Sequence, residues 1–423
     1  MKIYYETYGC AVMLGEAERV LEELKSKGYE VVGRPEEADA SIIFTCTVRS
    51  ETEQRMAWRI KELCKASKKL IVTGCLASAQ PGLVKMVCPR ASIVSNSSLH
   101  EIELALKGEK KYLLKGQRPR DWLKGVTPGG FRVVIPIADG CLGNCTFCIT
   151  KVARPRLVSQ RPDSIIEYAL KGVKRGAKEI WLTAPDVAAY GKEIGLELPD
   201  LLEKLLKVLP ENVYVRVGMM SPDTFREVMD RTIDVMRDPR VFKFFHLPLQ
   251  SASDKVLRLM GRRYTYSEFV EIVNKVRKAF NDPTIATDVM VGFPGEEEDD
   301  FELTLKALRE LAFERVHLAA YTPRPLTLGA RMPQVREDVK SRRVKRAMNV
   351  IEAVGVEVHK RYVGGKFKAF VDEYDQKHGT FVARLWNYTP VVLREESSLG
   401  EEIVVKIEGA TFYDLRGTVW SVS

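Results

Sequence analysis

The sequence contains no uninterrupted apolar run near the roughly 18 residues that a membrane-spanning helix needs. Its first ten residues, MKIYYETYGC, lack the apolar core of a signal peptide and are typical of a strand, so we expect no leader. Internal repeats and long low-complexity segments are also missing. These absences favour a globular protein of the cytoplasm that makes no use of a membrane.

Cysteine is scarce and unevenly placed, because three of the eight cysteines in 423 residues fall within the stretch DGCLGNCTFC, Asp139 to Cys148. In a cytoplasmic chain, cysteines are more often ligands or reactive thiols than disulfides. The formal net charge of +9 favours a polyanionic partner. A charged fraction of 29% also occurs as surface ion pairs in thermophile proteins, so charge alone does not decide between the two interpretations.

The first hundred residues alternate buried strand patterns with amphipathic helix patterns, which predicts a parallel α/β sheet. The strand patterns KIYYETY, ASIIFT and KKLIVTG run into Cys10, Cys46 and Cys75. Because the carboxyl ends of parallel strands meet at one edge of a sheet, we expect these three cysteines to converge. The alternative is three unrelated buried thiols. We expect Cys64 and Cys88, which do not follow this pattern, to be ordinary packed thiols.

The predicted fold class is α/β, with an N-terminal parallel α/β sandwich, a central partial (β/α) barrel and a small C-terminal all-β barrel. The central part alternates six strand patterns with five helical patterns, and its active site should lie at the carboxyl ends of the strands. The last part has short strands between Gly, Asn, Asp and Pro. The predicted domains are 1–112, 131–358 and 359–423, with a linker rich in Lys, Arg, Gly and Pro at 113–130.

Cys141, Cys145 and Cys148 have the spacing C-x3-C-x2-C and follow the strand pattern RVVIPI. Zinc sites usually close with a fourth ligand, and a bacterial ferredoxin run places a fourth cysteine shortly afterwards. Here the following stretch, ITKVARPRLVSQ, contains neither cysteine nor histidine. The simplest interpretation is a four-iron cluster with three protein ligands and one open iron. A three-cysteine zinc site is the alternative.

This loop after the first strand of a parallel barrel resembles that of the radical SAM superfamily. The resemblance implies that the three cysteines hold a [4Fe–4S] cluster whose open iron binds S-adenosylmethionine. It further implies cleavage of that cofactor to a 5′-deoxyadenosyl radical, chemistry that no side chain can supply. Phe147 matches the aromatic residue that packs near the adenine in that superfamily.

The chain also resembles the methylthiotransferase family over nearly its whole length. The motifs that carry this resemblance are TYGC, TCTVRSETE, VTGC, GCLGNCTFCITKVAR, HLPLQSASDKVL, TDVMVGFPGEEEDDF and YTPRPLTLGARM. It implies a second [4Fe–4S] cluster on Cys10, Cys46 and Cys75 and a C-terminal TRAM module that binds RNA. EIWLT, AAYG and PLQSASDKVL look most like the archaeal and eukaryotic branch, which adds a methylthio group at C2 of N6-threonylcarbamoyladenosine beside the tRNA anticodon.

The resemblance also implies the partners: a tRNA anticodon stem-loop, a low-potential electron donor of the ferredoxin or flavodoxin type, and a sulfur donor. We expect a monomer. Two other substrates within the family are isopentenyladenosine in tRNA and an aspartate of a ribosomal protein. A hypothesis of another class is a non-catalytic RNA-binding protein with structural metal.

Four further residues are predicted to bind the cofactor. Arg154 follows the cysteine loop and could bind a carboxylate, or serve as a structural cation. Asp186, Gln250 and Gly292 follow predicted strands, and Gly292, in VGFPGE, permits a close backbone approach. His246 is as consistent with a packed histidine as with a site residue. No ligand spacing marks the other four histidines, which are His100, His317, His359 and His378.

The stretch Lys340 to Lys368 holds nine Lys or Arg against two Glu, and it predicts contacts to RNA phosphates. The residues predicted to bind RNA are Lys360, Arg361, Lys366 and Lys368. Tyr388, Trp386 and Phe412 either stack on bases or fill the core of the small barrel.

The sequence departs from the methylthiotransferase pattern at seven positions. There the family pattern leads us to expect Asn or another polar residue, Gly, or Pro. These positions are Met13, Phe44, Pro155, Pro185, Val187, Leu326 and Leu328. Met13 and Phe44 flank the predicted second cluster, where neighbouring polar groups would tune its potential. These departures leave all six predicted cysteine ligands in place.

Overall fold

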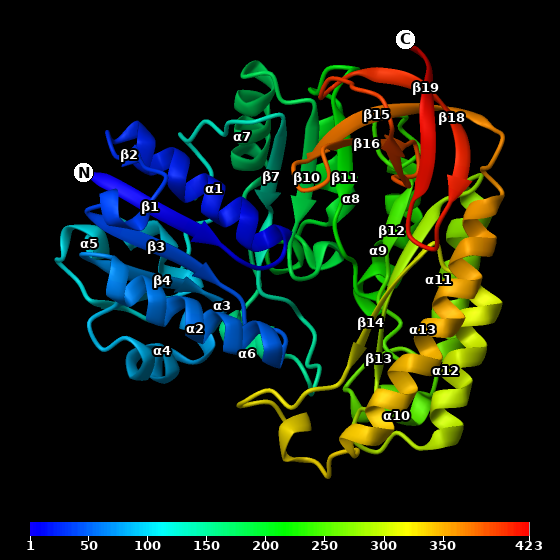
Figure 1. The fold of residues 1–423 in the computed structure, drawn as a ribbon, viewed down its shortest axis with the longest axis horizontal. Coiled ribbons are helices and arrows are strands. Elements are labelled where there is room, and N and C mark those ends of the chain that lie inside the picture. Colours follow the sequence, from blue (N-terminus) through cyan, green and yellow to red (C-terminus); the bar gives the residue numbers. More distant parts are fainter. Residues whose placement is uncertain (423) are drawn as a thin grey trace. The chain divides into compact units, whose positions relative to one another are not determined.

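The computed structural model describes residues 1–422, which form two compact units (Figure 1). The first unit comprises Met1–Arg175, Leu182–Val208 and Thr322–Arg331. The second comprises Gly176–Trp181, Leu209–Tyr321 and the chain from Met332 onward. The domain boundaries expected from the sequence stay a prediction, because these units are defined by compactness alone. Within residues 1–422, no helix is both long enough and apolar enough to cross a bilayer.

The first unit begins with a six-stranded parallel sheet of order β2-β1-β3-β4-β5-β6, as the alternation of patterns predicts. Its strands are β1 Lys2–Thr7, β2 Glu30–Val31, β3 Ala40–Thr45, β4 Leu70–Gly74, β5 Ser92–Val94 and β6 Tyr112–Leu113. The helices between them are α1 Ala11–Ser26, α2 Ser50–Ala66, α3 Cys75–Ala79, α4 Pro81–Val87 and α5 Ile102–Lys107, with 3-10 turns η1 Pro35–Glu37 and η2 Asn96–Glu101.

The core of this sheet follows from its apolar strands. Every residue of β3 and β4 is buried, as expected for central parallel strands covered on both faces. Helices α2 and α4 pack together against them through Met56, Ile60 and Val84. The strands β1, β3 and β4 are neighbours, so their carboxyl ends lie at one edge of the sheet.

The rest of the first unit continues with elements that carry the second cysteine loop. They are β7 Arg132–Pro136, β8 Ala138–Asp139, α6 Ile149–Ala153, β9 Val158–Ser159, α7 Pro162–Lys174, η3 Val187–Ala189, η4 Lys192–Ile194, α8 Leu198–Leu206 and η5 Gly329–Arg331. Helix α1 packs against β7. Their approach is so close that a β-carbon at Gly15 would lie 2.6 Å from the carbonyl oxygen of Val134, so this contact depends on glycine.

Strand β10, Glu179–Thr183, begins in the second unit and ends in the first. The second unit continues with parallel strands and helices: β11 Tyr214–Val217, α9 Pro222–Val235, β12 Phe244–His246, α10 Asp254–Leu259, α11 Tyr266–Ala279, β13 Thr284–Val291, α12 Glu298–Leu311, β14 Arg315–Ala320 and α13 Glu337–Lys360. The sheet β12-β13-β14 is parallel throughout. Helix α13 packs on α12 and on β14, and Figure 1 shows it running alongside α12.

The chain ends in a closed five-stranded barrel of order β15-β16-β17-β19-β18, which confirms the expected C-terminal all-β barrel. Its strands are β15 Lys366–Asp375, β16 Thr380–Leu385, β17 Pro390–Leu393, β18 Glu402–Ala410 and β19 Leu415–Val422. Alternate residues of these strands, among them Val371, Leu385 and Val405, fill the interior.

The prediction that Cys64 and Cys88 are packed thiols is wrong, because the two residues form a disulfide. Cys64 lies on α2 and Cys88 ends α4, and the packing of these helices places the two α-carbons 6.0 Å apart. The prediction relied on the redox state expected of the compartment. The tertiary contact between α2 and α4, which no local pattern reveals, instead decides the pairing of two cysteines 24 residues apart.

We predict that replacing both residues, Cys64→Ala with Cys88→Ala, lowers the free energy of unfolding. A disulfide closing a loop of this length contributes about 3 kcal/mol, mainly by restricting the unfolded chain. Thermal unfolding followed by circular dichroism should show a loss of several degrees. A reductant should lower the melting temperature of the wild type and leave that of the double variant unchanged. Equal melting temperatures under oxidising conditions would contradict the prediction.

Candidate iron–sulfur and cofactor centres

Three neighbouring strands bring Cys10, Cys46 and Cys75 together, as the sequence predicts. Cys10 precedes α1, Cys46 follows β3, and Cys75 is the first residue of α3. A β-carbon at Gly9, where φ is +136°, would lie 3.5 Å from the β-carbon of Cys46. The thiols also interact electrostatically, since Cys10 acts to raise the pKa of both Cys46 and Cys75. We call these three residues the first triplet.

Burial determines the protonation state of the first triplet. It raises the pKa of Cys75 to about 11 and also raises that of Cys46. The thiolate is the metal ligand, so metal binding at this triplet must release protons. Arg154 opposes the effect of burial, because its charge and its hydrogen bond to Cys75 act to lower the pKa of that thiol.

Cys141, Cys145 and Cys148 form the second triplet on the loop between β8 and α6. A β-carbon at Gly143 would lie 3.6 Å from Sγ of Cys145 and 3.9 Å from Sγ of Cys141, so both sulfurs flank this glycine. Burial raises the pKa of Cys141 to about 11, and Cys148 acts in the same direction. Burial, together with Cys145, also raises the pKa of Cys148.

The donor sets fit iron–sulfur clusters better than single zinc ions. The six cysteines outside the disulfide divide into the two triplets of three thiols. Thiolates at about 2.3 Å from one zinc ion lie within about 4 Å of one another. Among residues 1–422, however, only one group of three ligand residues, which contains no cysteine, has its donor atoms within 4.8 Å of one another. The wider spacing of the thiols suits a four-iron cluster, whose fourth iron each triplet leaves open.

A buried charge cluster lies between the two triplets and consists of Glu16, Arg118, Asp139 and Arg154. The Arg154 guanidinium donates to both carboxylate oxygens of Glu16 at 2.7 and 2.6 Å and also pairs with Asp139. Arg118 donates to Glu16 at 2.6 Å and lies 3.9 Å from Asp139. All four side chains are at most 7% exposed. Two cations and two anions leave the cluster formally neutral, as burial of charge requires.

Arg154 was predicted to bind the cofactor, but in the structure its guanidinium is engaged by other residues of the chain. Its guanidinium binds two carboxylates of the chain and the thiol of Cys75. Burial alone would lower the pKa of Arg154, but Glu16 and Asp139 raise it well above its usual value. Arg154 is therefore a fixed cation beside the first triplet, and its role in cofactor binding stays a prediction.

The segment Thr322–Arg331 contacts residues that neighbour both triplets in the sequence. Buried Arg324 pairs with Glu53 and donates to the Thr47 hydroxyl at 3.0 Å, next to Cys46. The Gly329 amide makes the second contact by donating to the Thr146 carbonyl at 2.8 Å, next to Cys145. The motif containing Arg324 was recognised in the sequence, but nothing local to it signals this contact, since its partners lie more than 250 residues away.

Asp186 and Phe147 also belong to the first unit. The carboxylate of Asp186 is buried and close enough to Cys141 to raise the pKa of that thiol. Phe147 lies within the cysteine loop and is half-buried. Both positions suit the predicted contacts to S-adenosylmethionine, which stay predictions.

Gln250 and Gly292 lie at the carboxyl ends of β12 and β13 in the second unit. Gln250 has φ of +67°. Its backbone N–H donates to the Asp288 carbonyl at 2.8 Å, and its backbone carbonyl accepts from the Met290 N–H at 2.9 Å. Gly292 has φ of +74°, and a β-carbon there would lie 2.2 Å from Cγ of Lys340. Glycine is therefore required at position 292 for a steric reason, and cofactor binding by these two residues stays a prediction.

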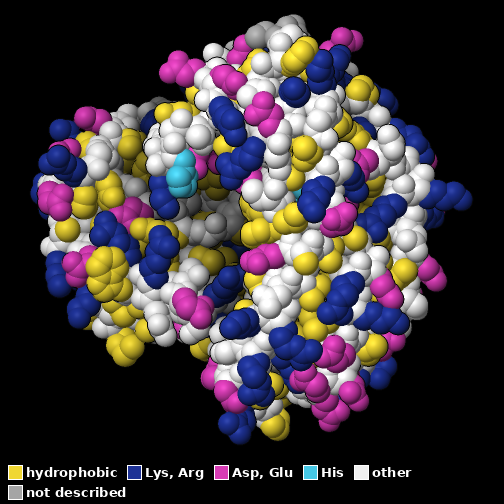
Figure 2. All heavy atoms as spheres, turned by 45° about the vertical axis from the view of Figure 1, so that its right-hand side comes forward, with side chains coloured by type: hydrophobic (Ala, Val, Ile, Leu, Met, Phe, Trp, Pro, Cys, Tyr) yellow, Lys and Arg dark blue, Asp and Glu magenta, His cyan; other side chains and the backbone are white. Residues whose placement is uncertain are grey.

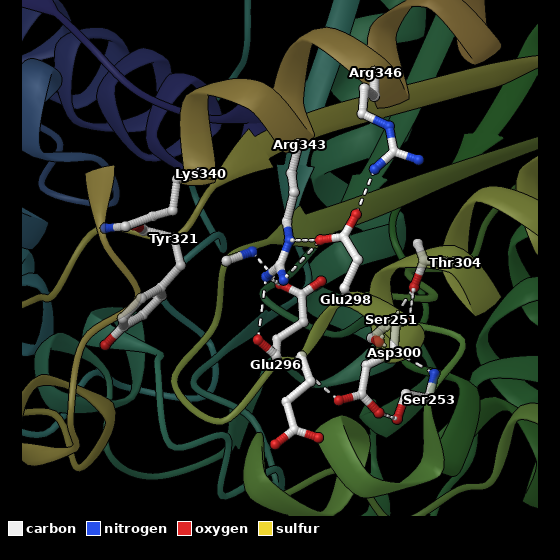
Figure 3. A network of polar contacts seen from close by, with 12 residues as sticks. Ser251, Ser253, Glu296, Glu298, Asp300, Thr304, Tyr321, Lys340, Arg343 and Arg346 are labelled. Carbon is white, nitrogen blue, oxygen red and sulfur yellow. Dashed lines mark hydrogen bonds and ion pairs between the residues drawn. The ribbon is translucent and has the colours of Figure 1, made fainter. Parts of the chain in front are cut away.

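The loop after Gly292 is fixed by ion pairs from α13 (Figure 3). Arg343 donates to the Glu296 carbonyl at 3.2 Å and pairs with Glu298 at 3.3 Å. Burial raises the pKa of Glu296 to about 7, although Arg343 acts to lower it. Lys340 donates to the Tyr321 carbonyl at 3.1 Å, so the same helix also holds the end of β14. The basic stretch Lys340 to Lys368 was interpreted from the sequence as an RNA contact. Most of it belongs to helix α13, which was not predicted.

The residues predicted to bind RNA have different environments. Arg361 pairs with Asp282 and, at 3.3 Å, with Glu314, which makes it a structural cation. Lys360 lies 3.5 Å from Glu357, and Lys366 and Lys368 are exposed. RNA binding by these residues stays a prediction. Figure 2 shows Lys and Arg mixed with Asp and Glu over the face drawn, so the net charge does not form one basic surface there.

The aromatic residues of the barrel divide between core and surface. Tyr388 is buried but packs edge-on against Phe244 of β12, so it lies outside the core cluster of the barrel itself. Trp386 remains 38% exposed. Trp420, which no motif in the sequence marks, is 56% exposed and has Nζ of Lys366 at 3.3 Å from its ring centroid. An exposed indole beside a lysine is suited to stacking on a base next to a phosphate.

Comparisons with known proteins agree with this geometry. Residues 135–308 match the radical SAM superfamily, residues 2–95 match the uncharacterized protein family UPF0004, and residues 360–420 match the TRAM domain. A probable threonylcarbamoyladenosine tRNA methylthiotransferase of Pyrococcus abyssi is 36% identical over all of both chains. The chain belongs to this methylthiotransferase family. The human threonylcarbamoyladenosine tRNA methylthiotransferase is 32% identical, over 98% of this chain and 73% of its own.

Two solved structures share the fold. The radical S-adenosylmethionine methyltransferase TsrM of Kitasatospora setae, with cobalamin and a [4Fe–4S] cluster bound, has a TM-score of 0.57 at 14% identity and covers 78% of this chain and 77% of its own. The cobalamin-dependent radical enzyme OxsB has a TM-score of 0.53 at 10% identity and covers 82% of this chain and 56% of its own. Membership of the methylthiotransferase family assigns two [4Fe–4S] clusters and S-adenosylmethionine to the chain, in agreement with the two triplets.

Four of the seven departures from the methylthiotransferase pattern fall in two kinds of place. Met13 and Phe44 are buried in α1 and β3, where they pack as core residues. Leu326 and Leu328 are 65% and 61% exposed, and Leu326 has φ of +67°, a conformation that favours the glycine expected there. The structure gives no reason for a leucine at position 326.

We predict that Glu16→Gln destabilises the first unit, because it leaves two buried guanidinium groups facing one carboxylate. Breaking a buried ion pair costs about 3–5 kcal/mol. The matched control is Glu62→Gln, whose exposed pair with Lys65 at 3.1 Å should contribute about 0–1 kcal/mol. Chemical unfolding of both variants measures the difference. The prediction is wrong if the two substitutions lower the free energy of unfolding equally.

We predict that Gly292→Ala displaces the loop that follows β13, because its β-carbon has no space beside Lys340. The control is Gly364→Ala, which has a similar φ of +86° and nothing within 4 Å of its β-carbon. Gly292→Ala should lower the melting temperature more than the control does, and should weaken S-adenosylmethionine binding at least tenfold in equilibrium dialysis. Equal effects of the two alanines on both measurements would show that backbone strain alone, not the steric clash, matters.

Proposed function

We propose that this chain inserts a methylthio group at C2 of N6-threonylcarbamoyladenosine next to the anticodon of tRNA. The observation that carries the proposal is that two separate thiol triplets lie in one compact unit and are joined by one buried charge cluster. A radical enzyme that needs a single cluster has no use for the first triplet. Full-length similarity to threonylcarbamoyladenosine tRNA methylthiotransferases supports the substrate.

The chain's own residues hold and orient the reactants. Cys141, Cys145 and Cys148 hold one cluster and leave one iron open to S-adenosylmethionine, and the first triplet holds the other. When bound, S-adenosylmethionine would supply the radical chemistry and the methyl group, and the clusters would pass on the donor's electron and hold or relay the donor's sulfur. Arg154 favours the thiolate form of Cys75, and Asp186, buried near Cys141, would contact the polar part of the cofactor.

The C-terminal barrel is the proposed tRNA contact. Its TRAM match and the exposed pair of Lys366 and Trp420 support this role. Contacts to phosphate by Lys366 and Lys368 should weaken as salt increases. The enzyme works as a monomer with an electron donor of the ferredoxin or flavodoxin type and a separate sulfur donor.

We predict that the anaerobically reconstituted protein holds about eight irons, two clusters of four. It should form 5′-deoxyadenosine from S-adenosylmethionine under reducing conditions. Cys145→Ala should abolish this cleavage, since it removes a ligand of the second triplet. Cys46→Ala should keep the cleavage and lose methylthio transfer. Iron analysis and chromatography of the nucleoside products measure both outcomes.

Mass spectrometry of anticodon-loop nucleosides, from cells with and without the gene, identifies the modified base. Loss of the methylthio group from threonylcarbamoyladenosine alone would support the proposed substrate. Its loss from isopentenyladenosine, or from a ribosomal protein aspartate, would replace that substrate with the other one. Bound zinc with no reductive cleavage, while all six cysteines are intact, would exclude a radical enzyme and favour a non-catalytic RNA-binding protein.

A further inference from the structure

Three polar side chains on neighbouring strands of the second unit point to the same face of the sheet. Asp288 and His317 are register partners on the parallel strands β13 and β14. His246, on β12, is the register partner of Ala286, two residues before Asp288. Residues two apart on a strand share a face, so His246, Asp288 and His317 all project to one side. We call them the His–Asp–His cluster.

The face that carries the cluster is the more exposed face of β13. On β13 the alternate residues Val289 and Val291 are buried, whereas Asp288 and Met290 are only half-buried. The side chains of His246, Asp288 and His317 are 16%, 33% and 40% exposed. Solvent-sized ligands can therefore reach the cluster, while the backbone beneath it is fixed by the strand pairing and by the Gln250 amide, which donates to the Asp288 carbonyl.

The donor atoms are spaced as the ligands of one metal ion would be. Nε2 of His246 and Nδ1 of His317 lie 3.1 and 3.0 Å from the same oxygen, Oδ1 of Asp288. All three donor atoms lie within 4.8 Å of one another. Two ligands at about 2.1 Å from a tetrahedral zinc ion are separated by about 3.4 Å. Small shifts of the side chains therefore suffice to bring all three atoms to one ion.

The chemistry of the donors selects the kind of ion. Two imidazoles and one carboxylate form the protein ligand set of many zinc enzymes and of the iron(II) facial triad. Such sites leave positions open to water or to an oxygen ligand. The nearest charged side chain on the same face of β14 is Arg315, and its guanidinium lies 4.5 Å from the ring of Tyr413, in the connection between β18 and β19.

We propose that His246, Asp288 and His317 bind one divalent transition-metal ion, with zinc as the probe, and leave coordination positions open on the exposed face of the sheet. This site contains no cysteine and shares no residue with either triplet. The alternative is a pair of hydrogen bonds, in which each imidazole donates to Oδ1 and no ion binds. Two imidazole donors sharing one oxygen satisfy the carboxylate, so affinity for metal distinguishes the two arrangements.

The test uses the anaerobically reconstituted protein with both clusters in place, so that no cysteine is available to added metal. One equivalent of Zn²⁺ is added, excess is removed by desalting, and metal is counted by mass spectrometry. The expected result is about one zinc per chain. X-ray absorption at the zinc edge should show only nitrogen and oxygen ligands at about 2.0–2.1 Å, with no sulfur near 2.3 Å.

Two variants of the cluster should weaken zinc binding at least tenfold: Asp288→Asn and His317→Gln. His317→Gln changes the most exposed of the three side chains, so it keeps the test decisive if Asp288→Asn does not fold. The control is His378→Gln, which breaks the exposed pair of His378 with Asp375 at 2.6 Å and should leave zinc binding unchanged.

Failure to retain zinc, a sulfur shell around the zinc, or full zinc binding by both cluster variants would overturn the proposal. None of these measurements uses tRNA or turnover. A failed metal site therefore leaves the proposed methylthiotransferase activity untouched, and a failed activity assay leaves the metal site standing.

Discussion

The buried charge cluster of Glu16, Arg118, Asp139 and Arg154 is the constraint on which the first unit depends. Glu16 lies on α1 after Cys10, and Asp139 and Arg154 lie on either side of the second triplet. Arg118 comes from the predicted linker. Unpaired charges in the interior are strongly unfavourable, so no one of these segments can be placed correctly unless the others are. The two triplets are thereby built together, although their cysteines are spread over residues 10–148 of the chain.

The same cluster connects structure with chemistry. Arg154 contributes to the folding of both loops and also acts on Cys75, where its positive charge favours a thiolate ligand. The segment Thr322–Arg331 adds a second connection, through Thr47 on one side and Thr146 on the other. A residue remote in sequence can therefore influence cluster binding without being a ligand. Arg324 is such a residue, because it is buried and lies close enough to Cys46 to lower the pKa of that thiol.

The parts of this molecule that follow from local patterns could be predicted from the sequence, and the parts that follow from tertiary contacts could not. Apolar runs ending in cysteine predicted the sheet edge and the first triplet, because strand polarity alone decides which ends meet. The disulfide depends on two helices packing together, and the charges along α13 concealed its apolar face. The His–Asp–His cluster was missed because His246, Asp288 and His317 have no ligand spacing along the chain. Only the register of three parallel strands aligns them.

The thiols of the two triplets and the imidazole and carboxylate groups of the His–Asp–His cluster belong to different units of the chain. Thiolates bind iron–sulfur clusters and zinc, whereas imidazole and carboxylate groups bind single divalent ions. All six thiols outside the disulfide belong to the first unit, and the His–Asp–His cluster belongs to the second. A divalent ion at the nitrogen and oxygen donors has no thiol among its ligands to compete with, and the clusters have no imidazole within their triplets. Each site can then be loaded by its own metal, because ligand type discriminates where raw affinity does not.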